Sequence, residues 1–102
     1  MMNGVGEMME ITFELPSALL PYAGGSAEVV VRGAACRTVG DALGALAARH
    51  AGVVDRVVDE RGQVRQHVNV FVDGESIRFL DGLATPLPPR TTISIVPAVS
   101  GG

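Results

Sequence analysis

The sequence predicts a small α+β domain in which one main helix packs across a β-sheet. Two observations support this fold class. Segments in which every second residue is apolar occur on both sides of one segment in which apolar residues recur every three or four positions. In addition, the 102 residues are 47% hydrophobic, which suffices for one core and therefore indicates a single domain.

The first two predicted strands are residues 10–15 and 27–32. In the first strand Ile11 and Phe13 alternate with polar residues, which is typical of a strand with one solvated face. The connection, residues 16–26, is rich in proline and glycine and reads as a long turn without a crossover helix. The two strands are therefore expected to pair antiparallel.

A helix is predicted next. Thr38 followed by Asp41 has the spacing of a capping box, with aspartate in place of the usual glutamate. Apolar residues then recur at helical spacing from Val39 to His50, and Gly52 is expected to end the helix. Residues 53–67 are predicted to form a short irregular turn and an exposed loop.

Residues 67–76 have the composition of a strand that runs into Asp73-Gly74, the dipeptide favoured in type I′ hairpin turns. A short strand is expected to continue through "IRFL" (77–80), and the prolines of 81–89 indicate turn and loop. The last strand, 91–97, carries large or β-branched residues on both faces and is therefore expected at the centre of the sheet.

The predicted core consists of the periodic apolar positions of these elements. They are Phe13, Leu15, Val29, Val31, Leu43, Leu46, Val70, Val72, Ile93 and Ile95. Four further apolar residues, Phe71, Ile77, Phe79 and Leu80, are expected in the core more often than at an interface.

Composition and motifs exclude several classes of function. The net charge is −3 and all eight basic residues are arginine, so no basic stripe or lysine is present and a nucleic-acid partner is not expected. The start of the chain lacks the features of a signal peptide or a membrane span, and the single cysteine, Cys36, allows no internal disulfide. A cytoplasmic protein without a membrane partner is therefore expected.

No enzyme constellation is present in the sequence. His50 and His67 have no neighbours with metal-ligand spacing, so no metal site is expected, and no phosphate-binding glycine loop occurs. The chain is consequently expected to be neither an enzyme nor a stable binder of any cofactor.

The end of the chain, "IVPAVSGG", is the most informative segment. Residues 98–102 follow the last strand and can extend about 17 Å at roughly 3.4 Å per residue. Glycine lacks a Cβ, so Gly101 and Gly102 can thread a narrow channel together with Val99 and Ser100. The Gly102 carboxylate, once adenylated by another enzyme, could then accept a nucleophile.

The chain resembles the MoaD/ThiS family of ubiquitin-like sulfur carriers. The resemblance covers about residues 9–102 and rests on the hairpin "VNVFVDGESIRF" and the ending "IVPAVSGG". It implies a β-grasp domain with a mixed sheet over residues 9–97. A disordered tail (1–8) would precede this domain and a flexible Gly-Gly tail (98–102) would follow it.

The resemblance also implies partners and chemistry. An E1-like adenylyltransferase and sulfurtransferase would consume ATP and Mg²⁺ and convert the Gly102 carboxyl group to a thiocarboxylate. The segments "LPYAGG" and "GLATPL" look most like the carriers of cysteine synthesis. In that pathway the sulfur acceptor would be a pyridoxal-phosphate enzyme.

Two alternatives stay open. The chain could be the small subunit of molybdopterin synthase, or a β-grasp subunit that inserts its tail into a partner without being modified. For docking on the activating enzyme, the expected residues are Phe71 and Leu80, with Arg78 as a charge at the rim.

Overall fold

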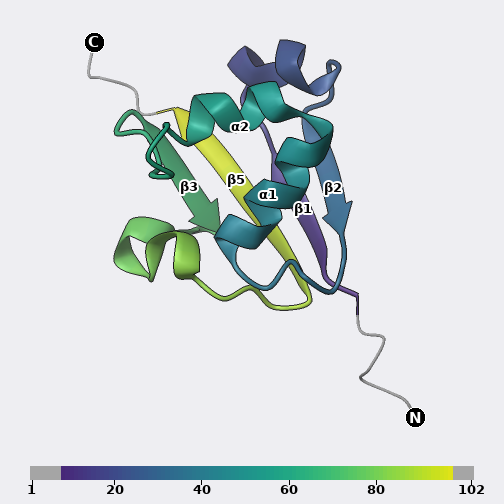
Figure 1. The fold of residues 1–102 in the computed structure, drawn as a ribbon, viewed down its shortest axis with the longest axis vertical. Coiled ribbons are helices and arrows are strands. Elements are labelled where there is room, and N and C mark those ends of the chain that lie inside the picture. The colour runs from purple at the N-terminus through teal and green to yellow at the C-terminus, as the bar shows by residue number, and fades with distance from the viewer. Residues whose placement is uncertain (1–7, 98–102) are drawn as a thin grey trace.

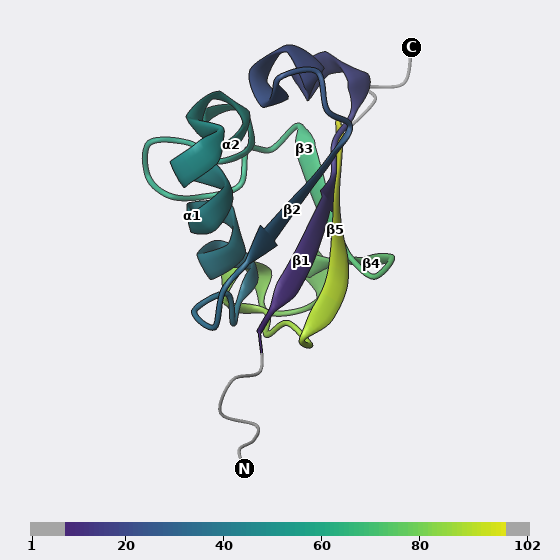
Figure 2. The same ribbon diagram turned by 90° about the vertical axis from the view of Figure 1, so that its right-hand side faces the viewer.

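The computed structural model describes residues 8–97, and residues 1–7 and 98–102 lie outside the described residues. The predicted N-terminal and C-terminal tails therefore fall almost entirely outside the description. Five strands form one mixed sheet, and the helices lie on one of its faces (Figures 1 and 2). This arrangement confirms the predicted α+β class.

The sheet has the order β2-β1-β5-β3-β4. The first two strands, β1 (Glu10–Glu14) and β2 (Glu28–Arg32), pair antiparallel as predicted. The last strand, β5 (Arg90–Pro97), lies parallel to β1 and antiparallel to β3 (Val68–Val72). Its central position confirms the expectation drawn from its two apolar faces.

The main helix, α1 (Val39–Arg49), begins at the predicted capping box. The Asp41 N–H donates to Thr38 Oγ1 at 3.1 Å, and the Thr38 N–H donates back to Asp41 Oδ2 at 3.1 Å. Two of the orphan N–H groups at the helix start are thus satisfied within the same four residues. The carboxylate also lies at the positive end of the helix dipole.

The predictions for Gly52 and for residues 53–67 are partly wrong. Gly52 does not end the helical region, because a second helix, α2 (Ala51–Val57), follows directly after His50. Val53 and Val57 are one turn apart on this helix and both are fully buried, so packing on the sheet holds the segment helical. An isolated bridge between Val58 and Val64 then orders the loop that follows.

Three more segments, predicted as turn, strand or loop, are 3₁₀ helices. The long turn after β1 contains η2 (Ser17–Ala23), which packs against α2. Strand β4 is only Glu75–Ser76, and "IRF" forms η3 (Ile77–Phe79) instead of continuing the strand. A further turn, η4 (Gly82–Ala84), lies in the predicted loop.

The hairpin turn is confirmed at Asp73-Gly74. Both residues have positive φ, 49° and 90°, as a type I′ turn requires.

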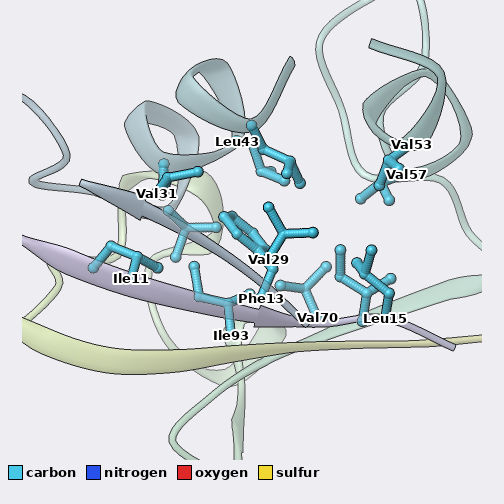
Figure 3. Packing of buried hydrophobic residues seen from close by; sticks show 14 of the residues in the cluster. Ile11, Phe13, Leu15, Val29, Val31, Leu43, Val53, Val57, Val70 and Ile93 are labelled. Atoms are coloured by element: carbon cyan, nitrogen blue, oxygen red, sulfur yellow. The ribbon is translucent and has the colours of Figure 1, made fainter. Parts of the chain in front are cut away.

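The core lies between the sheet and the two α-helices (Figure 3). All ten residues predicted for it are buried. The sequence did not single out the contributions of α2, Val53 and Val57, whose side chains point toward the end of the core that holds Leu15 and Val70 (Figure 3).

Candidate functional site

The C-terminal segment leaves the domain from the centre of the sheet. Strand β5 has a hydrogen-bonded neighbour on each side, and its last residue, Pro97, stands opposite Val68 at the start of β3. The residues predicted for modification and threading, Val99, Ser100, Gly101 and Gly102, lie outside the described residues. What the structure describes is the strand that leads to them: β5 pairs with both neighbours at residues 93–94, and its last residues, 95–97, pair with β3 alone.

A mainly apolar groove of about 290 Å³ lies at the same end of the sheet as Pro97. It is lined by Leu19 and Tyr22 of η2, by Arg56 of α2 and by His67. The Arg56 guanidinium carbon lies 3.6 Å from the centroid of the Tyr22 ring, a cation–π contact that joins η2 to α2. Pro97, the last described residue, thus lines an apolar recess that has a positive charge beside it.

The face of the sheet opposite the helices carries no covering element in the described part of the chain (Figure 2). Side chains on this face are half-buried or exposed, and most are polar. Ser94 Oγ, for example, donates to Glu14 Oε1 at 2.9 Å. Three apolar residues interrupt the polar surface: Val30 on β2 and Phe71 on β3 are half-buried, and Val96 on β5 is 41% exposed one residue before Pro97.

The structure does not bring the three predicted docking residues into one patch. Phe71 lies on the open face of β3. Arg78 instead donates to the carbonyl oxygens of Gln66 and Val68 at 3.2 and 2.9 Å, which ties η3 to the edge of β3. Leu80 lines a different hollow, with Val72 of the covered face. Their role in docking stays a prediction.

Three of the four further apolar residues expected in the core are not buried. Phe71 is half-buried and Leu80 is 38% exposed. Phe79 is 85% exposed, whereas Ile77, two residues earlier, is buried. In a strand both residues would share a face, but a 3₁₀ helix has three residues per turn and separates them. The sequence signal for this 3₁₀ helix is Ser76, which directly precedes "IRF" and caps the helix.

The chemistry of the described residues is sparse. The Cys36 thiol is buried, and this burial raises its pKa, with a further contribution from the nearby Asp41 carboxylate. A thiol with a raised pKa is a poor nucleophile. Within residues 8–97 no group of three or more His, Cys, Asp or Glu side chains could hold a metal ion. In the same range no helix has the length and apolar character to cross a membrane.

Comparison with known proteins gives consistent matches. The model of the ThiS family matches residues 15–102. The curated sulfur carrier protein CysO of Mycobacterium tuberculosis is 34% identical over 96 residues, which are 92% of this chain and all of that protein. Small archaeal modifier protein 3 of Haloferax volcanii is 42% identical over 65 residues, 64% of this chain and 70% of that protein.

The fold has solved counterparts. A chain in the crystal structure of the BexX/CysO complex of Amycolatopsis orientalis is 34% identical and superposes with a TM-score of 0.80. The match covers 90% of this chain and 99% of that one. The likeness confirms the β-grasp fold that the sequence resemblance implies.

Proposed function

The chain belongs to the ThiS family, and on that premise we propose that it is a sulfur carrier whose reactive group is the Gly102 carboxyl. The chain itself would not be an enzyme in this role. Partner enzymes would activate the carboxyl, load it with sulfur and remove the sulfur again.

The proposal is carried by the position of β5. The strand that leads into the Gly-Gly segment is the middle strand of the sheet, with five paired residues on each side. It ends at Pro97, so residues 98–102 can reach about 17 Å from a fixed base, at roughly 3.4 Å per residue. The full-length similarity to CysO, and a family match that extends to residue 102, support the same assignment.

The chemistry needs two displacements. A Gly102 carboxylate oxygen attacks the α-phosphorus of ATP, pyrophosphate leaves, and an acyl adenylate forms on an E1-like partner that binds Mg²⁺. Hydrosulfide (HS⁻) delivered by that partner then attacks the carbonyl carbon, AMP leaves, and the remaining S–H proton is lost to solvent. The product is a thiocarboxylate, which is ionised at neutral pH and is a stronger nucleophile than the carboxylate.

We place the accepting step in cysteine synthesis or a related biosynthetic sulfur transfer. Similarity to two CysO proteins supports this choice, and the matched complex pairs one of them with a second protein, BexX. The acceptor would be a pyridoxal-phosphate enzyme of the cysteine-synthase type, or another enzyme that presents an electrophilic carbon shielded from water.

We further propose that the activating partner docks on the open sheet face. Phe71 and Val96 supply its exposed apolar surface, and Val96 directly precedes the end of β5. A partner on this face can receive the C-terminal segment without displacing a helix. Arg78 and Leu80 lie on other surfaces, so we do not assign them to this contact.

The test changes the C-terminus and leaves the domain intact. Deletion of Gly102, or addition of one alanine after it, should abolish ATP–pyrophosphate exchange by the activating enzyme, because the carboxyl is displaced by one residue, about 3.4 Å. Substitution of Glu60 by Gln in the exposed loop is the matched control and should leave exchange unchanged. Exchange at the wild-type rate with either altered terminus would refute the proposal.

A second candidate, attachment to other proteins, is favoured by the 42% identity to a small archaeal modifier protein. In that role the activated Gly102 carbonyl would be attacked by a lysine amine of a target. The chain has no lysine, so conjugation could not extend through its own side chains. Mass spectrometry separates the two functions, since a carrier gains sulfur in place of oxygen, whereas a modifier appears in isopeptide-linked adducts.

A further inference from the structure

Phe79 is an exposed aromatic residue at a position where nothing in the described chain covers it. Of the five large exposed hydrophobic residues among residues 8–97, it is the most exposed, at 85%, and Leu80 beside it is 38% exposed. Isolated exposed apolar residues are ordinary on protein surfaces. Two adjacent ones with a phenylalanine held almost entirely in water are characteristic of an anchor at a protein interface.

The position of Phe79 is fixed by its neighbours. Ser76 caps η3 through a hydrogen bond from the Arg78 N–H at 3.2 Å, and the Leu80 N–H closes the turn on the Ile77 carbonyl at 3.0 Å. The Arg78 side chain ties the same turn to the edge of β3. The aromatic ring is therefore presented by an ordered turn, and little conformational entropy would be lost when a partner binds it.

Acidic side chains surround this anchor. Phe79 and Leu80 line a hollow of about 580 Å³ together with the carboxylates of Asp73, Glu75 and Asp81. The Asp73 carboxylate is used within the domain, where it accepts hydrogen bonds from the last strand. Within residues 8–97, the Glu75 and Asp81 side chains form no ion pair or hydrogen bond, and no basic side chain lines the hollow.

We propose that Glu75, Phe79, Leu80 and Asp81, here called the acidic-apolar patch, dock a partner protein through an apolar pocket bordered by arginine or lysine side chains. The pocket would receive the Phe79 ring, and the basic border would face the two free carboxylates. This patch is separate from the open sheet face, because the hollow is lined by Val72 of the covered face.

The distance to the C-terminal segment favours an enzyme that acts on that segment as the partner, an assignment that rests on the proposed function. Along β3, Val72 at the patch end and Val68 opposite Pro97 are four residues apart, about 13 Å at 3.3 Å per residue. An interface of standard size buries about 800 Å² on each side and is about 30 Å across. One enzyme can therefore hold the patch and receive the C-terminus together.

The first experiment measures the Michaelis constant (KM) of the activating enzyme and of the sulfur-accepting enzyme for the full-length chain. Phe79→Ala should raise the KM of at least one of them tenfold or more and leave kcat within twofold, because the C-terminus is unchanged. Met8→Ala removes another exposed apolar side chain, outside the patch, and should have no effect. Wild-type KM values for Phe79→Ala with both enzymes would overturn the proposal.

Charge is tested separately. The double variant Glu75→Gln, Asp81→Asn should raise the KM at low salt and flatten its dependence on ionic strength, since screening acts only on charges that are present. Glu60→Gln, in an exposed loop outside the patch, is the matched control. If the KM of the double variant depends on ionic strength as strongly as that of the wild type, the partner's pocket has no basic border facing these carboxylates.

Direct binding distinguishes failure of this proposal from failure of the proposed function. If the wild-type chain is never adenylated, the proposed function fails. Titration of ¹⁵N-labelled chain with each enzyme still tests the patch: broadened amide signals of residues 75–81 support it, and unaffected signals overturn it. A concentration-dependent dimer that Phe79→Ala abolishes would also overturn it, because the patch would then hold a second copy.

Discussion

Asp73 offers a sharp test of how the turn before η3 positions the last strand. Its N–H donates to the Thr92 carbonyl at 2.9 Å, and its carboxylate accepts from Thr91 Oγ1 and, at 3.1 Å, from the Thr92 N–H. Its φ of 49° lies in the left-handed region, which aspartate tolerates better than most residues. The backbone and the side chain of this one residue therefore hold both the hairpin turn and the start of β5.

Three substitutions separate the backbone effect from the hydrogen bonds. Asp73→Ala loses both: left-handed strain costs about 1 kcal/mol, and the two bonds, one of them exposed, contribute about 1–3 kcal/mol together. The expected loss is about 2–4 kcal/mol. Asp73→Asn keeps the conformation and an acceptor oxygen and should lose about 0.5–1.5 kcal/mol. Asp73→Gly keeps only the conformation and should fall between them.

The assay is urea denaturation followed by circular dichroism. The slope of the unfolding free energy against urea concentration is compared between each variant and the wild type. An unchanged slope shows that the midpoint reports stability alone. A loss below about 0.5 kcal/mol for Asp73→Ala would refute the role assigned to this side chain. Equal losses for Gly and Ala would refute the contribution of the left-handed backbone.

Three further predictions concern the rest of the domain. Leu46→Ala should cost about 2–5 kcal/mol in urea denaturation, because the side chain is fully buried under α1, and a loss below about 0.5 kcal/mol would contradict that burial. Cys36 in the folded chain should react with iodoacetamide at pH 8 far more slowly than free cysteine, because burial raises its pKa; mass spectrometry showing equal rates would refute this. The hydrogen bond from the Gln63 N–H holds the Asp59 pKa below its usual value, so its stabilising effect is present above the unfolded pKa, near 3.9, and is lost as pH falls through the lower folded value. Asp59→Asn should therefore be less stable than the wild type at neutral pH and approach it below about pH 3, as measured by denaturation across pH.

Features with a local cause could be predicted from the sequence. The capping box at Thr38, the positive-φ turn at Asp73-Gly74 and the alternation in β1 each depend on residues within four positions of one another. The central place of β5 also followed from its own composition. Its parallel pairing with β1 joins opposite ends of the chain, and no local pattern reports it.

Features set by tertiary packing were missed. Gly52 was interpreted as a helix stop, yet it lies within α2, where an added Cβ would stand 3.1 Å from Tyr22 Cδ1. The glycine is thus explained by the close approach of η2, a segment 30 residues earlier that was itself predicted as a turn. Phe79 was misplaced for a similar reason, because the turn that exposes it depends on the pairing of β3 with β4.

For the candidate site, the C-terminal residues stay a prediction, since they lie outside the described residues, and the structure describes only the strand that leads to them. That prediction rests on glycine chemistry and family resemblance, both of which are readable without coordinates. The exposed surfaces cannot be read from the sequence, because the exposure of Phe71, Phe79 or Leu80 depends on which side of the sheet the helices occupy (Figure 2).

The two edges of the sheet indicate how partners can approach this domain. These edges are β2 and the part of β3 with which β4 does not pair. Arg49 Nη1 donates to the Val30 carbonyl on β2 at 2.7 Å, and Arg78 Nη2 donates to the Val68 carbonyl on β3 at 2.9 Å. Free carbonyl groups on an edge strand can pair with a strand from another chain. The two arginine hydrogen bonds occupy one such carbonyl oxygen at each edge of the sheet. Strand β4 pairs with only two residues of β3 and leaves the rest of the β3 edge unpaired. The Arg78 hydrogen bond to Val68 occupies an acceptor on this unpaired part. Recognition is therefore expected through side-chain surfaces, the open face and the acidic-apolar patch, rather than through added strands.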